Sequence, residues 1–110
     1  MRRIVAYGAY YQTFMDSLPA HEQMKIRRAI LLFQTAERVP WHYVKYVDEG
    51  IFEFRVSMSG KEARIFFVYD EGNTVIFLNC FIKKSRALPR KEIAMAKKIK
   101  KQYEQSKQTL

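Results

Sequence analysis

The spacing of apolar residues changes near residue 43, and this change limits the folds open to the chain more than any other feature. Before it, apolar residues recur at helical spacing. From residues 43 to 82 they alternate with polar residues instead, as where Phe52, Phe54 and Val56 are separated by charged side chains. Alternation of this kind is typical of strands that bury one face. The sequence therefore predicts helices followed by an antiparallel sheet.

Turn signals and prolines divide these two regions into elements. The expected elements are strands over 3–9, 51–58, 64–69 and 74–82, and helices over 10–18, over 21–38 and from Pro89 onward. Ser59-Gly60 and the segment 70–73 supply the turns between the strands. The expected order is β-α-α-β-β-β-α, an α+β fold with an antiparallel sheet and the helices packed on one face. With 110 residues, the chain has room for one domain over residues 1–110.

The two turns also fix which residues face each other. With Ser59-Gly60 as a two-residue loop, Arg55 lies directly opposite Arg64. With the next turn at Gly72-Asn73, Phe81 lies opposite Arg64 as well. This register predicts a core face formed by Phe52, Phe54, Val56, Ile65, Phe67, Leu78 and Ile82. The other face is expected to carry Arg55, Arg64, Phe66, Asn79 and Lys83.

Three cations on one face of a sheet require an explanation. Like charges directly across a ladder, as expected for Arg55 and Arg64, are destabilising. A phosphate bound between them and Lys83 would offset the repulsion, since Arg offers a bidentate fork and Lys a mobile point charge. Alternatively, Glu53 and Glu62 neutralise the arginines and the face is merely solvated. The pattern alone leaves both interpretations open.

The net charge of +9 is concentrated in one part of the chain. Residues 83–101 hold nine basic residues and one acid, Glu92, whereas basic and acidic residues are nearly balanced elsewhere. A local basic patch is typical of a protein that binds nucleic acid. A lysine-rich surface helix that maintains solubility would explain residues 97–101 equally well, but not Lys83 and Lys84 at the end of a strand.

Membrane partners and disulfides are both disfavoured. No apolar run approaches the roughly 20 residues that a spanning helix needs, and the first residues lack the apolar segment of a signal peptide. The single cysteine, Cys80, lies within an apolar strand pattern, where a buried and unreactive thiol is expected. These features favour a reducing, cytoplasmic location.

Four blocks over residues 49 to 103 resemble a known family, in order and at its spacing. The resembling blocks are 49–56 (the "G-L-x-E-x-R" strand), 64–67 ("R-I-F-Y"), 78–85 ("L-H-G-F-x-K-K-T") and 89–96 ("P-x-x-E-I-x-x-A"). They are motifs of HigB-like toxins, within the RelE/ParE superfamily of toxin–antitoxin toxins. The first 48 residues match that family only in general character.

The resemblance implies a ribosome-dependent endoribonuclease that cuts mRNA in the ribosomal decoding site. Its partners would be that mRNA and a cognate antitoxin, usually a helix-turn-helix protein, whose acidic segment could cover the basic face. By position, Arg64 matches the arginine that contacts the scissile phosphate. The candidate catalytic residues are Arg64, Arg55, Lys83 and Lys84. The candidate RNA contacts are Arg86, Arg90, Lys91, Lys97, Phe66 and Asn79.

Two departures from the family concern proton transfer. Asn79 replaces the common histidine, and Tyr103 is the one nearby aromatic hydroxyl of the last helix. No cluster of His, Cys, Asp or Glu has the spacing of metal ligands, so a reaction without cofactors is expected. In such a reaction the RNA 2′-hydroxyl attacks its own phosphate, cations stabilise the developing charge, and Lys83 or Lys84 handles protons.

Other interpretations of the same sequence remain open. A ParE-like protein of the same fold would bind DNA gyrase without cutting RNA, because fold alone does not determine function. A third reading is a nucleic-acid-binding module with no enzymatic activity. His42, between Trp41 and Tyr43, could stack on RNA bases, although such aromatic residues more often pack in the core.

Overall fold

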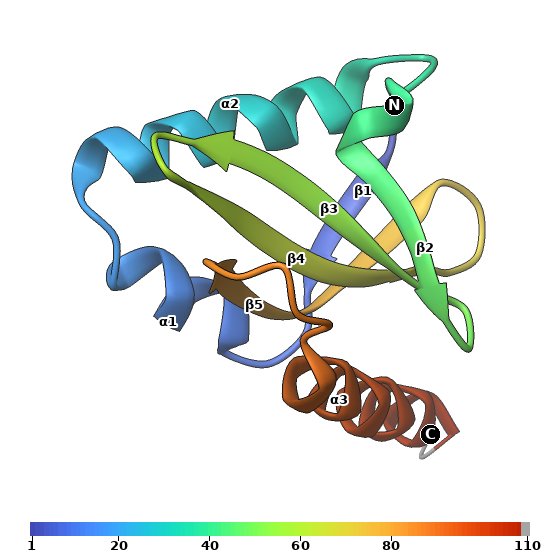
Figure 1. The fold of residues 1–110 in the computed structure, drawn as a ribbon. Coiled ribbons are helices and arrows are strands. Elements are labelled where there is room, and N and C mark those ends of the chain that lie inside the picture. Colours follow the sequence, from blue (N-terminus) through green and yellow to red (C-terminus); the bar gives the residue numbers. More distant parts are fainter. Residues whose placement is uncertain (109–110) are drawn as a thin grey trace.

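The computed structural model, which describes residues 1–108, is an α+β fold with a five-stranded mixed sheet and three α-helices (Figure 1). The elements are β1 (Arg3–Ala6), α1 (Tyr10–Asp16), α2 (Ala20–Thr35), the short 3-10 helix η1 (Trp41–Tyr43), β2 (Val44–Asp48), β3 (Ile51–Met58), β4 (Lys61–Tyr69), β5 (Thr74–Lys83) and α3 (Arg90–Gln108). The α+β class expected from the sequence is confirmed, and the expected helices are all present.

The strand order in the sheet is β1-β5-β4-β3-β2. The β3–β4 and β4–β5 pairs are antiparallel, as predicted, but β1 runs parallel to β5, so the expectation of a wholly antiparallel sheet was wrong. The two helices between β1 and β2 carry the chain from one edge of the sheet to the opposite edge. The strand β2, which the sequence analysis did not separate from β3, is a short edge strand.

A tight turn between β2 and β3 explains why this edge strand escaped the sequence analysis. Asp48 pairs with Ile51, so that Glu49 and Gly50 alone form the loop. Both have positive φ, 51° and 78°, as a type I′ turn requires. Gly50 adopts this conformation without a penalty, but Glu49 is an unusual residue for it, and Glu-Gly is a weak turn signal.

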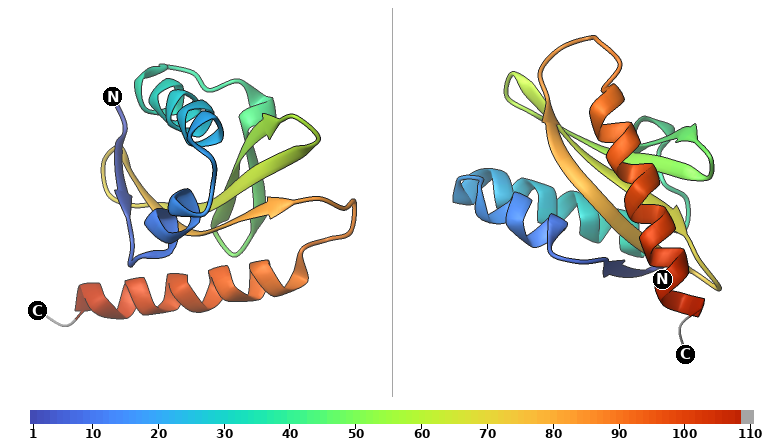
Figure 2. Two further views of the ribbon diagram at one scale, coloured as in Figure 1. Left: turned by 90° about the vertical axis from the view of Figure 1, so that its left-hand side faces the viewer. Right: turned by 90° about the horizontal axis from the view of Figure 1, so that it is seen from below.

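Helices cover both faces of the sheet, which corrects the expectation that they pack on one face (Figure 2). The α1/α2 core combines Met15, Ile26 and Phe33 of these helices with residues such as Phe54 and Phe67 of the sheet. The α3 core combines Ala96 and Ile99 of the last helix with Ile51, Phe66, Val68, Ile76 and Leu78. The sheet is therefore the middle layer of three.

The central strand β4 explains why two covering layers are needed. Ile65 and Phe67 point to the α1/α2 core, while Phe66 and Val68 point to the α3 core. All four are buried, and Ile65, Phe66 and Phe67 are fully so. A strand that is apolar on both sides must be covered on both sides to remove that area from water. The run of residues 65–68 thus carried the information that a helix lies on each face.

A bulge in β5 moves one predicted core residue to the opposite face. The register Arg55↔Arg64 and Arg64↔Phe81 is confirmed, but between Ile65↔Cys80 and Phe67↔Phe77 the strand β5 has one extra residue. An extra residue reverses the alternation of side chains beyond it. Leu78, expected in the core with Phe67, therefore packs under α3 instead.

The helix α2 buries less of its surface than its sequence indicates. It ends at Thr35 rather than 38, and only Ile26 and Phe33 among its apolar residues are fully buried. Met24 and Leu31, included in the predicted apolar stripe, are 52% and 58% exposed. A wide apolar stripe in the sequence predicts more burial than occurs when only a narrow part of the helix surface contacts the sheet.

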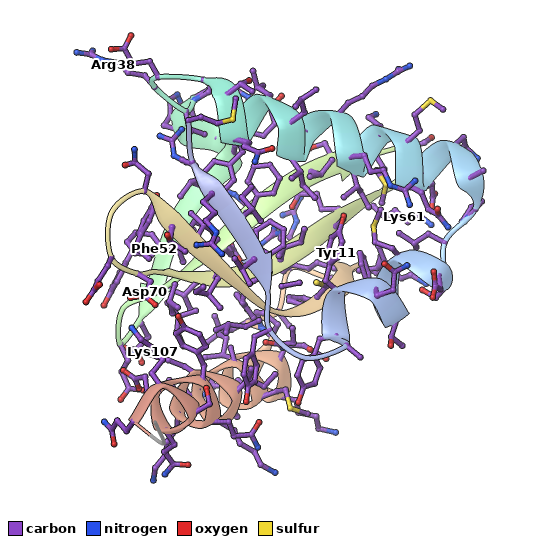
Figure 3. The ribbon with its side chains drawn as sticks, turned by 180° about the vertical axis from the view of Figure 1, so that it is seen from behind. Tyr11, Arg38, Phe52, Lys61, Asp70 and Lys107 are labelled. Atoms are coloured by element: carbon purple, nitrogen blue, oxygen red, sulfur yellow. The ribbon has the colours of Figure 1, made fainter. Side chains whose placement is uncertain are left out.

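The C-terminal half of α3 is fastened to the turn between β4 and β5, where Asp70 and Lys107 lie close together in Figure 3. Lys107 Nζ lies 2.8 Å from Asp70 Oδ1, and the hydroxyl of Tyr103 donates to Asp70 Oδ2. Hydrogen bonds from Lys107 and Tyr103 lower the pKa of Asp70 to about 2. Burial and the bond to Asp70 raise the pKa of Tyr103 to about 12.

We predict that Asp70→Asn lowers the thermal stability of the protein at neutral pH. Because the pKa of Asp70 is lowered by folding, its contribution is present above its unfolded pKa near 4 and lost as the pH falls through about 2. The difference in melting temperature between wild type and variant, followed by circular dichroism, should shrink over that interval. Glu71→Gln, on the same turn, is the control, and an undiminished difference at the lowest pH would contradict the assignment.

Candidate nucleic-acid interface

The face of the sheet beneath α3 changes from apolar to charged where that helix begins. Phe66, Ile76 and Leu78 lie under the helix. On the same face of the sheet, past the N-terminal end of the helix at Arg90, the side chains are polar or charged: Glu53, Arg55, Ser57, Glu62, Arg64 and Lys83. The predicted alternation places these residues on one face, and the pairings Arg55↔Arg64 and Glu62↔Lys83 bring them together. The charged end of the sheet is the candidate site.

Arg64 lies at the centre of this site and is held by two carboxylates. Its Nη1 donates to Glu53 Oε1 at 2.7 Å, its Nε donates to Glu62 Oε1 at 2.9 Å, and its Nη2 also donates to Glu62. Arg64 is 8% exposed and Glu53 is 4% exposed. The charge is thus compensated inside the protein, as a buried arginine requires. For Arg64 itself, the expectation that Glu53 and Glu62 neutralise it is confirmed.

Glu62 is the more accessible of the two carboxylates, with a side chain that is 35% exposed. Its partial burial acts to raise its pKa, but hydrogen bonds from Arg64 and Ser57 and the nearby charge of Arg55 outweigh this, so its pKa is lowered. Glu62 is therefore ionised at neutral pH and faces solvent, whereas Glu53 lies beneath Arg64.

An open groove of about 590 Å³ passes over Arg64 and Glu62. We call it the Arg64 groove; it is lined by residues 57, 58, 60–62, 64 and 83–86, among them Lys83, Lys84 and Arg86. The β3–β4 hairpin and the loop after β5 project at the same end of the molecule and form its walls (Figure 2). Within residues 1–108, Lys83, Lys84 and Arg86 form no ion pair. The groove therefore carries uncompensated positive charge.

Arg55 faces Arg64 across the ladder and supplies a further cation. It is half-buried, and its Nε is buried without a hydrogen-bond partner. A buried donor without a partner is costly, so Arg55 is held at an energetic cost beside Arg64. The Arg64 groove thus holds three of the four predicted catalytic residues, Arg64, Lys83 and Lys84, and one predicted RNA contact, Arg86. The fourth, Arg55, pairs with Arg64 across the ladder but does not line the groove.

The other predicted RNA contacts lie elsewhere. Arg90 and Lys91 are exposed at the start of α3, outside the lining of the groove. Lys97 is engaged with the turn between β2 and β3, at 2.8 Å from Asp48 and 3.1 Å from Glu49. Phe66 is fully buried, so it has no exposed face on which a base could stack.

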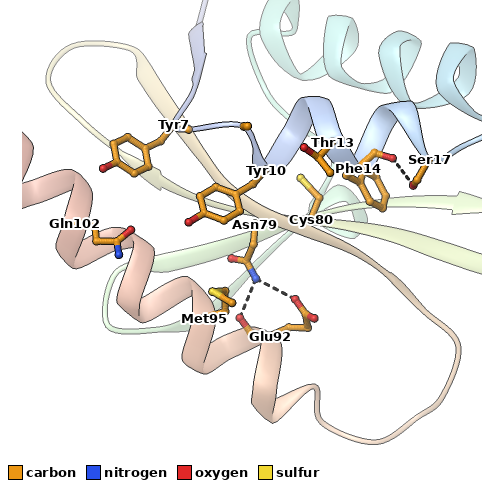
Figure 4. A pocket seen from close by; sticks show the side chains of 12 residues that line it. Tyr7, Tyr10, Thr13, Phe14, Ser17, Asn79, Cys80, Glu92, Met95 and Gln102 are labelled. Carbon is orange, nitrogen blue, oxygen red and sulfur yellow. Dashed lines mark hydrogen bonds between the residues drawn. The ribbon is translucent and has the colours of Figure 1, made fainter.

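Asn79 lies in an apolar pocket between α1 and α3, shown in Figure 4. Its Nδ2 donates to the backbone oxygen of Glu92 at 3.0 Å and to Glu92 Oε2 at 3.1 Å, while its Oδ1 is buried without a partner. Cys80 lines the same pocket, and burial together with the charge of Glu92 raises the pKa of its thiol to about 12. The thiol is thus protonated, as expected for an unreactive cysteine.

Sequence reasoning did not assign Glu62 or Ser57 to the site. Each lies two residues along its strand from a predicted site residue, Ser57 from Arg55 and Glu62 from Arg64, and Ser57 Oγ donates to Glu62 Oε2 at 3.3 Å. The signal that could have found them was the same ladder register, because it places Ser57 opposite Glu62 and Glu62 opposite Lys83.

Neither a metal centre nor a membrane span is found in the part of the chain that the structure describes. Residues 1–108 contain no group of three or more His, Cys, Asp or Glu side chains arranged to hold a metal ion. None of the helices in that range has the length and apolar composition needed to cross a bilayer.

We predict that Glu53→Gln destabilises the protein more than Glu62→Gln. Removing one partner of a buried ion pair leaves a charge poorly compensated, at a cost of about 2 kcal/mol where a second carboxylate remains. Loss of the more exposed Glu62 should cost under about 1 kcal/mol. Urea unfolding of both variants measures the two free energies, and an equal or reversed order would show that Glu53 does not carry the charge compensation.

The sequence as a whole was compared with known proteins. No curated protein matches the chain. A family model described as "Phage derived protein Gp49-like (DUF891)" matches residues 13–101, a span that includes α2, the four strands β2 to β5 and the first half of α3. The match covers most of the chain and the whole of the Arg64 groove. The chain therefore belongs to the phage-derived Gp49-like family.

Proposed function

We propose that this protein is the toxin of a toxin–antitoxin pair and acts as an endoribonuclease on mRNA held by the ribosome. Membership of the Gp49-like family, which is loosely linked to such toxins, supports the first part. The observation that carries the second is the Arg64 groove, where a rigidly held arginine is surrounded by cations without partners in the described chain. The resemblance to HigB-like toxins supports both parts.

Charge is the first argument for RNA in the groove. Arg64, Lys83, Lys84 and Arg86 of the groove, with Arg55 beside Arg64, outnumber the carboxylates Glu53 and Glu62. An anion entering the groove would remove the repulsion among these side chains. A phosphate of a flexible single strand satisfies this requirement and reaches both walls of an open groove.

Positioning is the second argument. Glu53 and Glu62 hold the Arg64 guanidinium at three nitrogen atoms, so it loses little further freedom when it meets a phosphate. In the proposed reaction, the 2′-oxygen attacks the adjacent phosphorus and the bond from phosphorus to the 5′-oxygen breaks. Cyclic phosphate and a 5′-hydroxyl remain. Arg64 and Arg55 stabilise the charge that develops on the non-bridging oxygens.

The proposed cleavage also requires two proton transfers. The 2′-hydroxyl must lose a proton, and the departing 5′-oxygen must gain one. Glu62 is ionised and solvent-facing, so we assign it as the acceptor of the first proton. Its lowered pKa makes it a weak base, which fits a slow reaction that gains much of its rate from the way the ribosome holds the mRNA. Lys83 or Lys84 donates the second proton.

Cleavage in cells tests the proposal. Wild type, expressed from a tightly controlled promoter, should generate new 5′ ends within translated codons, mapped by primer extension. Lys83→Gln/Lys84→Gln should suppress them, whereas Lys98→Gln/Lys101→Gln, with equal loss of charge on exposed positions of α3, should not. Plasmid supercoiling is measured in parallel. Altered supercoiling with intact mRNA would replace the nuclease with a gyrase inhibitor, and harmless expression would also reject the proposal.

The role of Glu62 is tested separately from RNA binding. Removing a carboxylate from a cationic groove strengthens its attraction for RNA, so Glu62→Gln should bind RNA at least as tightly as wild type. Its cleavage should nevertheless be slower by about 10²-fold, the usual contribution of a general base. Arg64→Lys keeps the charge but loses the bidentate fork, and should also cleave slowly. Normal cleavage by Glu62→Gln would assign the first proton to another group.

A further inference from the structure

A second basic groove lies on the other side of β3 from the Arg64 groove. It has a volume of about 410 Å³, within the range of small-ligand sites. Lys25 and Arg28 of α2, His42 and Tyr43 of η1, and Arg55 and Ser57 of β3 line it. We call it the His42 groove.

This groove exists because β2 is shorter than its neighbour. The pairing of β2 with β3 begins at Val44↔Phe54, so residues 55–58 of β3 have no strand beside them on this edge of the sheet. The helix α2 runs above this open edge, and η1 leads into β2 next to it (Figure 1). The space that a longer β2 would fill remains open to solvent.

An exposed aromatic pair, Trp41 and His42, lies beside the groove, and His42 lines it. The ring of Trp41 meets that of His42 edge to face at 5.9 Å, and His42 packs against Tyr43 at 4.5 Å. Tyr43 in turn stacks on Phe54 in the core at 5.9 Å. Trp41 is nevertheless 83% exposed, so core packing does not explain it. The pair is therefore held to the core through Tyr43, while the ring of Trp41 is open to solvent.

The charged side chains that line the His42 groove are all basic. They are Lys25, Arg28 and Arg55, and no carboxylate among residues 1–108 lines it. The buried Arg55 Nε has no hydrogen-bond partner. Ser57 lines both grooves, and Arg55 faces Arg64 across the ladder, so the two grooves meet at these residues. A basic path with an aromatic platform is the arrangement that binds single-stranded nucleic acid.

We propose that the His42 groove binds a nucleotide adjoining the scissile phosphate, with its base stacked on the exposed ring of Trp41. Lys25 and Arg28 contact its phosphate, and Arg55 lies between this nucleotide and the phosphate at Arg64. The inference rests on the proposed function, since it extends the path of the same RNA strand. It assigns substrate contacts to α2, from which the sequence analysis drew no candidate, and to η1, where the sequence analysis raised stacking by His42 as one possibility.

The single tryptophan makes the stacking directly measurable. A short RNA with 2′-O-methyl groups cannot undergo cleavage by its own 2′-oxygen, and it is titrated into the intact protein. Binding is followed by anisotropy of a dye on the RNA and stacking by quenching of Trp41 emission. Both signals should saturate together. Binding without quenching, or no binding by wild type, overturns the proposal.

Variants separate stacking from charge. Trp41→Ala should weaken binding of this RNA by about 10-fold, and should have little effect on an abasic strand of the same length. Arg28→Gln should weaken binding of both, whereas Arg27→Gln, its neighbour outside the groove, should not. Equal effects of Trp41→Ala on both strands, or of Arg27→Gln and Arg28→Gln, contradict the subsite.

Cleavage distinguishes failure of this inference from failure of the proposed function. If wild type quenches on RNA but yields no cleaved mRNA in cells, the subsite stands and the nuclease falls. If wild type cleaves while Trp41→Ala binds and cleaves normally, the nuclease stands and the subsite falls.

Discussion

Arg64 lies in the central strand of the sheet, β4, and its charge must be compensated inside the protein. The arrangement of the polar end of the sheet depends on that compensation. A buried guanidinium must have carboxylate partners, and Glu53 and Glu62 supply them from β3 and β4. The cations of that face outnumber these two carboxylates, so positive charge remains once Arg64 is compensated. The ion pair thus stabilises the fold and leaves Arg55, Lys83 and Lys84 available to an external anion.

The helix α3 determines where the apolar part of this face ends. It covers Phe66, Ile76 and Leu78, and its contacts at Asp48, Glu49 and Asp70 hold it along that half of the sheet. The bulge in β5 turns Leu78 under the helix, while Phe81 and Lys83 keep the register that places them beside Arg64 and Glu62. One strand therefore serves the core at one end and the groove at the other.

Much of the site was predictable because it depends on local rules. A two-residue turn at Ser59-Gly60 fixed Arg55 opposite Arg64. The position of Lys83 on the same face, at the end of β5, followed from the register of the next pair of strands. What the sequence did not reveal depends on tertiary arrangement. Residues 65–68 indicate that both faces are covered, but not which helix covers which face. The bulge at Leu78 and the gap beside β3 have no signal within a few residues of the chain.

The account is tested most directly by locating RNA on the protein surface. Amide chemical shifts of the isotope-labelled protein are followed during titration with uncleavable 2′-O-methyl RNA. If the Arg64 groove binds RNA, the largest changes fall on residues 55–64 and 83–86, at the polar end of the sheet. Changes confined to the pocket around Asn79, or to the lysines of α3 between residues 97 and 101, would contradict it.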